Sequence, residues 1–167
     1  LIFLTQSQAP LGRLIAVKQG QTLAEGRTLV AECEMKLEDA IRQGDQLVLF
    51  YLKDAASFVR VVDAEGKKVH DLSLPSQWGA CTLAMQNGRG IRKSDSLILE
   101  FESFVHSPML LKLTGDQLSV LYQPNPKTAA DIEVRQIFTE APDGERIPAF
   151  AVMPKGLEKT GKTPTLM

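Results

Sequence analysis

The 167-residue chain is long enough for one domain of ordinary size, or for parts of two. Hydrophobic residues make up 44% of the chain, and 19 basic against 20 acidic side chains leave a net charge of −1. This balance gives no electrostatic reason to expect a nucleic acid or an anionic membrane as a partner. The longest apolar runs have five or six residues, far short of the roughly 20 needed to cross a bilayer, which indicates a soluble protein.

Both ends of the chain are apolar, at Leu1–Leu4 and at Pro164–Met167, as if they were cut from a longer parent. The lack of a targeting signal therefore says nothing about that parent. A cytoplasmic location is favoured and a periplasmic one stays open.

Three apolar segments recur at similar spacing, which indicates an internal repeat. They begin at Leu1, Leu47 and Leu97, so that the starts are 46 and 50 residues apart. In each unit a turn-prone patch follows, and a second apolar segment starts 12 or 13 residues after the first, at Leu14, Val59 and Met109. The constant offset predicts that all three units are built from the same strands.

The middle unit shows the pattern most completely. Its second segment enters the turn Asp63–Lys67 and then residues 68–74, which reads as two hairpins in sequence. Leu37–Ile41 and Gly79–Met85 precede the second and third units and are candidate innermost strands. A helix over Glu34–Gln43 is the competing interpretation of the first of these segments.

Four strands per unit at a period near 50 residues are typical of a β-propeller blade. We therefore expect a mainly β chain: a partial propeller of about two and a half four-stranded blades, followed by a β-hairpin. The blade-like units are 1–30, 31–75 and 76–122, a linker covers 123–133, and the terminal hairpin lies in 134–167.

The linker follows from the prolines of Gln123–Lys127, which remove backbone donors and favour extended geometry. Beyond it, Glu133–Thr139 alternates as a strand does, residues 142–145 form a turn, and Arg146–Met153 is a second strand.

Neither the nucleophile-elbow motif nor the zinc-peptidase motif occurs in the chain. The patterns G-x-S-x-G and H-E-x-x-H are absent from the sequence, and Gly88-Arg89-Gly90 is better explained by a turn than by a dinucleotide loop. Cys33 and Cys81 lack the spacing of a zinc site or of a disulfide framework, so we expect two buried or half-buried thiols.

The remaining candidates all have a structural explanation. His70 and Asp71 are neighbours on a strand and point to opposite faces, so His70 is interpreted as a solvent or blade-edge residue. His106 is expected to make a structural hydrogen bond to local backbone, and Glu100 and Glu102 to lie on one solvated face. Trp78 fits an amphipathic core residue better than the lining of a ligand funnel. The sequence thus predicts no catalytic, cofactor-binding or metal-binding residue and no plausible serine–histidine pair.

The C-terminal segments resemble a known family. They are Val134–Phe138, Asp143–Phe150, Pro154–Leu157 and Gly161–Leu166, and they look like the start of the catalytic domain of prolyl oligopeptidases, a family of serine peptidases. Upstream, residues 8–14, 51–54 and 101–108 look like successive propeller segments of the same family.

The resemblance implies a two-domain parent, in which a seven-bladed propeller caps an α/β-hydrolase domain and admits short proline-containing peptides to a Ser-Asp-His triad. Cleavage would follow proline. The triad would lie beyond Met167, so the resemblance assigns no catalytic residue to this chain and implies no cofactor. The present chain would then be a non-catalytic fragment, inactive alone.

Two other interpretations stay open: a freestanding propeller-like interaction module, and a related hydrolase with another specificity. Uncovered strand edges, together with the hairpin side chains Ile137, Phe138, Ile147 and Phe150, also predict a homodimer or larger self-association.

Overall fold

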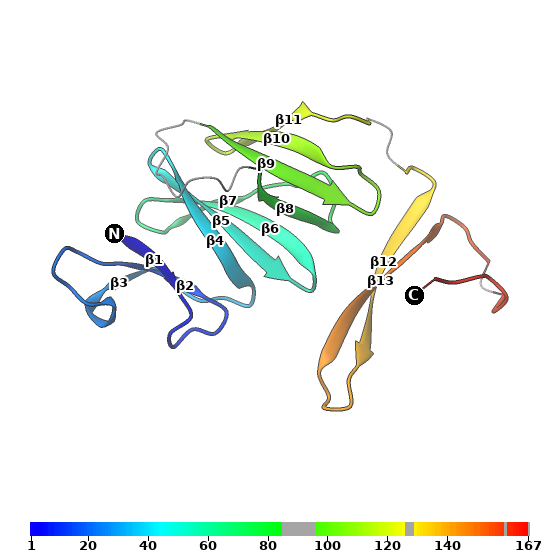
Figure 1. The fold of residues 1–167 in the computed structure, drawn as a ribbon, viewed down its shortest axis with the longest axis horizontal. Helices are drawn as coiled ribbons and strands as arrows, with labels where there is room; N and C mark the ends of the chain where they lie inside the picture. The colour runs from blue at the N-terminus through cyan, green and yellow to red at the C-terminus, as the bar shows by residue number, and fades with distance from the viewer. Residues whose placement is uncertain (85–95, 126–128, 159, 167) are drawn as a thin grey trace.

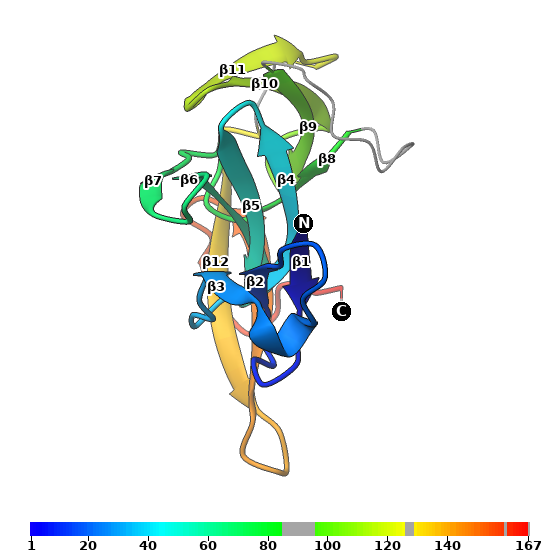
Figure 2. The same cartoon turned by 90° about the vertical axis from the view of Figure 1, so that its left-hand side faces the viewer.

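The computed structural model describes all residues except 85–95, 126–128, 159 and 167. These described residues form four antiparallel sheets and one short 3-10 helix, Leu23–Glu25 (Figures 1 and 2). The first two sheets contain β1 (Ile2–Thr5), β2 (Arg13–Ala16) and β3 (Arg27–Val30), then β4 (Lys36–Gln43), β5 (Gln46–Lys53), β6 (Ala56–Asp63) and β7 (Lys68–Asp71). The other two contain β8 (Gly79–Leu83), β9 (Ser96–Ser103), β10 (Met109–Thr114) and β11 (Gln117–Tyr122), then β12 (Ile132–Glu140) and β13 (Arg146–Pro154).

The second and third sheets follow the same plan. Each is a four-stranded meander whose strands pair in chain order, and two-residue turns join β4 to β5, β5 to β6 and β10 to β11. Gly44 and Gly115 have positive φ in two of these turns, as short hairpin connections require. The expected mainly β chain built from blade-like units is confirmed.

The first of the candidate innermost strands is β4, so the helix over Glu34–Gln43 does not form. A bulge between Leu37 and Asp39 interrupts its pairing with β5. Because a bulge shifts the alternation by one residue, the apolar positions on either side of it no longer follow a period of two. The second candidate begins as β8 at Gly79, while Met85 and Gly88-Arg89-Gly90 lie outside the described residues.

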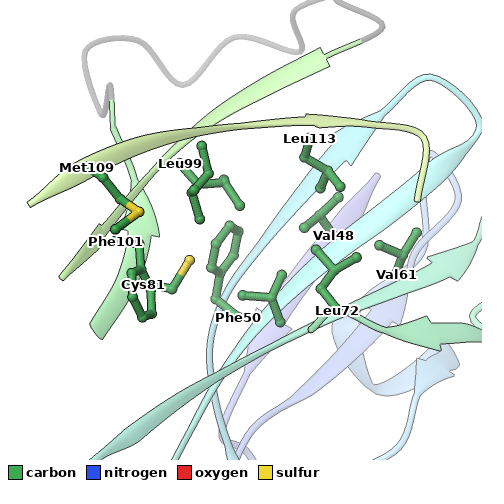
Figure 3. Packing of buried hydrophobic residues seen from close by; sticks show 11 residues of the cluster. Val48, Phe50, Val61, Leu72, Cys81, Leu99, Phe101, Met109 and Leu113 are labelled. Carbon is green, nitrogen blue, oxygen red and sulfur yellow. The ribbon is translucent and has the colours of Figure 1, made fainter. Parts of the chain in front are cut away.

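The second sheet is buried on both faces. Val48 and Phe50 of β5 pack with Val59 and Val61 of β6 against the third sheet, where Leu99 of β9 belongs to the same cluster (Figure 3). The intervening β5 residues Leu47, Leu49 and Tyr51 point the other way and pack with Leu14 and Leu29 of the first sheet. Successive strand residues face opposite sides, so the run of six apolar residues fills two cores at once.

Close backbone contacts tie the first two sheets together. The Leu37 amide of β4 donates to the Leu11 carbonyl at 2.7 Å. Gly66, in the β6–β7 turn, has φ +85°, and a Cβ placed on it would lie 1.8 Å from the Leu29 carbonyl oxygen of β3. Glycine is required there by both the backbone conformation and the lack of space.

The fourth sheet is a two-stranded hairpin. β12 and β13 form nine opposed pairs, from Ile132 with Pro154 to Glu140 with Arg146. Opposed residues share a face, so Gln136 and Phe150 lie on one face, whereas Ile137 and Ala149 lie on the other. Among the described residues, the two strands pair only with each other.

No helix among the described residues is long and apolar enough to cross a bilayer.

Gly79→Ala is expected to destabilise the chain by about 3 kcal/mol, at the upper end of the cost of overpacking. A Cβ at Gly79 would lie 2.5 Å from Cζ of the buried Phe101 and 2.7 Å from the Glu102 carbonyl oxygen, so both side chain and backbone must move. Urea unfolding followed by far-UV circular dichroism measures the loss.

Gly20→Ala is the control, because Gly20 has φ +86° but nothing within 4 Å of the added Cβ. The free energy of unfolding of this variant should fall by about 1 kcal/mol, because only backbone strain is added. Equal losses in the two variants would contradict the packing argument.

Candidate functional site

Three connections lie at one end of the second and third sheets and form what we call the loop end. They are the β5–β6 turn (Asp54–Ala55), the connection 72–78 between β7 and β8, and the β9–β10 loop (104–108). The β12–β13 hairpin lies beside this end, at the right in Figure 1. The loop end therefore faces the segment that the sequence analysis separated from the propeller.

The β5–β6 turn presents a carbonyl group to the hairpin. Both of its residues have positive φ, +49° at Asp54 and +60° at Ala55, as a two-residue hairpin turn of the primed type requires. The Asp54 carbonyl oxygen accepts a hydrogen bond from Nε2 of Gln136 at 2.7 Å. A strained turn thus supplies one polar contact between the loop end and β12.

Three aromatic rings supply the apolar contact, and we call them the ring cluster: Trp78, Phe104 and Phe150. The Phe150 centroid lies 5.5 Å from that of Trp78 and 5.1 Å from that of Phe104, with both ring pairs tilted. These distances are typical of favourable aromatic pairs. Phe150 comes from β13, directly opposite Gln136, so both contacts leave the same face of the hairpin.

The ring cluster corrects two predictions. Trp78 is half-buried at the loop end and belongs to neither buried core cluster, so its interpretation as a core residue is wrong. Phe150 is half-buried and not uncovered, unlike Ile137, which is 51% exposed. Neither Gln136 nor Phe104 was among the candidate residues. Counting residues outward along both strands from the turn at 142–145 would have placed Gln136 opposite Phe150.

Two open hollows, of about 320 and 540 Å³, adjoin the ring cluster. Trp78 and Ala55 line the first, and His106 and Pro108 line the second. Residues 102–104 line both. The loop end therefore offers an aromatic and partly polar surface, suited to contact with another chain segment.

Ser103 and His106 form a hydrogen bond where β9 enters the β9–β10 loop, so the partner of the His106 ring is a serine side chain and not the local backbone that was expected. Ser103 Oγ lies 3.1 Å from Nδ1 of His106. The same oxygen accepts the backbone N–H groups of Val105 and His106, at 3.2 and 3.1 Å. The His106 ring also meets Phe101 edge to face, with centroids 6.2 Å apart. This is the geometry of a side-chain-capped turn, in which serine acts as the acceptor.

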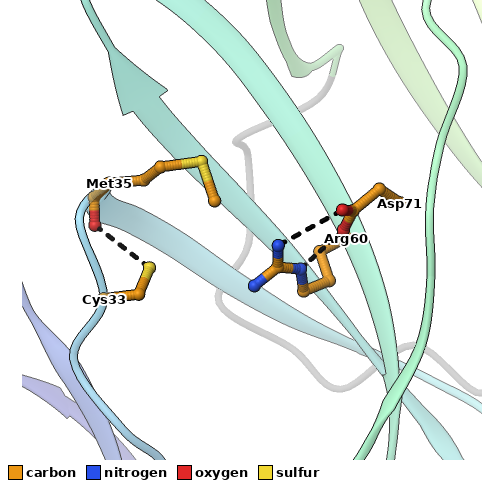
Figure 4. A network of polar contacts seen from close by, with 4 residues as sticks. All are labelled: Cys33, Met35, Arg60 and Asp71. Carbon is orange, nitrogen blue, oxygen red and sulfur yellow. Dashed lines mark hydrogen bonds and ion pairs between the residues drawn. The ribbon is translucent and has the colours of Figure 1, made fainter.

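His70 and Asp71 have separate partners, as their opposite directions predicted. Asp71 pairs with Arg60 on the neighbouring strand, with Nε to Oδ1 at 2.5 Å (Figure 4). That carboxylate raises the pKa of the Arg60 guanidinium, chiefly through the hydrogen bond. His70 Nε2 lies 3.0 Å from the Asp116 carbonyl oxygen in the β10–β11 turn, so His70 joins the second sheet to the third.

Glu100 and Glu102 are exposed on β9, on the face away from the core cluster, which confirms the expected solvated face. Cys33 is half-buried, and its Sγ donates to the Met35 carbonyl oxygen at 3.6 Å (Figure 4). Cys81 is buried, so the predicted pair of buried or half-buried thiols is confirmed. In the part of the chain that the structure describes, no three His, Cys, Asp or Glu side chains gather as metal ligands would.

Stacked four-stranded meanders with this sheet order define a segment of a β-propeller. Residues 1–119 match the family described as the prolyl oligopeptidase N-terminal β-propeller domain, and the chain belongs to this family.

Individual relatives agree with the family. The prolyl endopeptidase of Elizabethkingia meningoseptica is 30% identical over 172 residues, which cover 100% of this chain and 23% of that protein. The prolyl endopeptidase of Elizabethkingia miricola is 33% identical over 70% of this chain and 16% of its own length. A solved structure from work on two prolyl endopeptidases is 29% identical, with a TM-score of 0.82 over 94% of this chain and 23% of that chain. The chain thus spans about a quarter or less of these relatives.

Cys33 and Cys81 are expected to react with a thiol reagent under different conditions, Cys33 in the native chain and Cys81 only after unfolding. In the native chain a thiol reagent should modify Cys33 alone, because burial raises the pKa of the Cys81 thiol from 9.0 to about 12 and leaves almost no thiolate near neutral pH. The folded state therefore favours the protonated thiol, a contribution to stability that is present below pH 9 and lost as the pH rises towards 12. Intact-mass spectrometry counts the modified thiols.

Cys33→Ala and Cys81→Ala are the matched controls. The first should show no native modification, and the second should behave as the original chain does until it unfolds. Rapid native labelling of the Cys33→Ala variant would contradict the burial of Cys81.

Proposed function

We propose that this chain is the closing part of the propeller of a two-domain serine peptidase, together with the first hairpin of its catalytic domain. In that enzyme the propeller limits access of peptides to a Ser-Asp-His site that cleaves after proline. The family match over residues 1–119 carries this proposal.

The hairpin adds support from within the chain. Its segments resemble the start of the catalytic domain in prolyl oligopeptidases, and one of its faces contacts the loop end through Gln136 and Phe150. A freestanding interaction propeller has no need of such a segment. Reading the gene beyond Met167 separates the two candidates, since only a peptidase would continue into the remainder of a hydrolase sheet.

The access function predicts selection by substrate size. A protein that carries this segment joined to a hydrolase domain should cleave a short proline-containing chromogenic peptide, and should leave an unfolded proline-containing protein uncut, because only a short chain passes the propeller. Product release from the two substrates at equal molar concentration is the measurement. Equal rates on both would contradict the access function.

The 167-residue chain alone should cleave neither substrate, and it serves as the negative control together with Ser103→Ala. Ser103 Oγ already accepts two backbone N–H groups, so the serine has no activated role beside His106. Turnover by the purified chain that is lost in Ser103→Ala would show that the Ser103–His106 pair is catalytic.

We also propose that the isolated chain associates with itself through the outer face of the hairpin. Ile137 and Ile147 lie on the face opposite Phe150 and are 51% and 46% exposed. A second copy can cover these side chains by a closed two-fold contact. No partner other than short peptides and a second copy is proposed.

Association is expected to depend on that outer face. Sedimentation at micromolar concentration should give a dimer or larger assembly, and Ile137→Asp should weaken it strongly. Leu23→Asp, at an equally exposed position in the 3-10 helix, is the matched control and should leave association unchanged. A compact monomer near 18.4 kDa throughout this range would contradict the proposal.

A further inference from the structure

We propose that Phe150, held between Trp78 and Phe104 and assisted by Gln136, is a releasable clamp that sets where the hairpin docks on the loop end. The hairpin would leave and rejoin the loop end as one unit. The consequence for domain orientation, given below, rests on the proposed function, whereas the clamp itself does not.

The hairpin can move without losing its own structure. All nine opposed pairs of β12 and β13 are internal to it, from Ile132 with Pro154 to Glu140 with Arg146. Among the described residues, neither strand joins the ladder of another sheet. Displacing the hairpin therefore breaks no strand pairing, which is the main cost of moving a sheet strand.

The contacts that hold the hairpin at the loop end come from side chains. Phe150 meets the two rings, and its opposed neighbour Gln136 donates Nε2 to the Asp54 carbonyl oxygen at 2.7 Å. Because Gln136 and Phe150 form one cross-strand pair, a single rotation of the hairpin makes or breaks both contacts.

The ring cluster is only partly shielded from water. Trp78 and Phe150 are half-buried, and Phe104 is 49% exposed. Contacts at such positions are weaker than those of a closed core, where Phe101 is fully buried. Gln136 can also exchange its Asp54 acceptor for water, since the turn is at the surface.

A pivot lies beside the clamp. The Ala129 amide, just before β12, donates to the Val105 carbonyl oxygen of the β9–β10 loop at 3.1 Å. This backbone bond fixes the start of the hairpin close to Phe104 without using either hairpin strand. Rotation about this point would swing Phe150 away from the two rings while the chain stays attached.

If the hairpin begins the sheet of a peptidase domain, the clamp sets the orientation of that domain against the propeller. Phe150 and Gln136 are then positioning residues, since neither touches a reacting group.

Trp78 is the chain's one tryptophan, so its fluorescence reports directly on the clamp in the 167-residue chain. Phe150→Ala should shift the Trp78 emission to longer wavelength and raise its quenching by acrylamide about two- to threefold, with the far-UV circular dichroism of the sheets retained. Phe138→Ala is the matched control: Phe138 shares the hairpin face of Phe150, but its ring contacts Arg146. This control should leave Trp78 emission and quenching unchanged.

Unchanged emission and quenching in Phe150→Ala, or an equal change in Phe138→Ala, would overturn the proposal. Should Phe150→Ala lose its sheet signal, Gln136→Leu decides the question, because it removes the donor to Asp54 and keeps the side-chain size. Increased quenching of Trp78 in that variant supports the clamp, and unchanged quenching refutes it. None of these measurements uses peptide cleavage, so a failure of the proposed peptidase function leaves the result on the clamp intact.

Discussion

Burial of the second sheet on both faces is the constraint on which the rest of the structure depends. Val48 and Leu49 are neighbours on β5 and both are fully buried, one towards the third sheet and the other towards the first. Burying each side chain stabilises the fold by about 1.5–3 kcal/mol relative to exposure. Neither stacked neighbour can be removed without exposing one whole face of β5, so the three sheets form a single cooperative stack.

The stack also creates the candidate site. Because the second and third sheets repeat the same meander and pack face to face, their corresponding connections fall at one end. The Asp54 carbonyl, Trp78 and Phe104 come from three separate connections, and no short segment of the chain contains all of them. The core between the two sheets therefore positions the groups of the loop end, which are themselves only partly buried. This core includes Phe50, Val59, Leu99 and Phe101.

Most of the strand arrangement could be predicted from the sequence, because periodic apolar segments and turn residues are local signals. The six apolar residues from Leu47 to Leu52 already indicate a strand buried on both faces. The ambiguity at β4 arose where the bulge between Leu37 and Asp39 interrupts the alternation. In the sequence, a bulge is visible only as an interruption of the two-residue alternation of apolar positions. A short helix would interrupt this alternation as well.

The contacts of the candidate site were harder to predict, since they depend on pairs distant in sequence. The sequence around Trp78 does not show whether its ring packs in the core or contacts Phe150. Both positions favour a large side chain that is apolar over most of its surface. The Ser103–His106 bond is different. It spans one turn before Pro108, and the capacity of serine to cap such turns could have indicated it from the spacing, although the sequence analysis expected a backbone partner for His106.

The hairpin turn connects the local signals with the distant contacts. Pro142 and Asp143 occupy the centre of a turn closed by the Gly144 amide and the Ala141 carbonyl at 2.9 Å, and Gly144 itself has φ +86°. A turn followed by a left-handed glycine is a three-residue hairpin loop, and the Ala141 amide completes it by donating to Glu145 at 2.8 Å. This loop fixes the register that sets Gln136 opposite Phe150. A slip of one residue would turn Phe150 away from Trp78, so five residues at the tip of the hairpin determine which face meets the propeller.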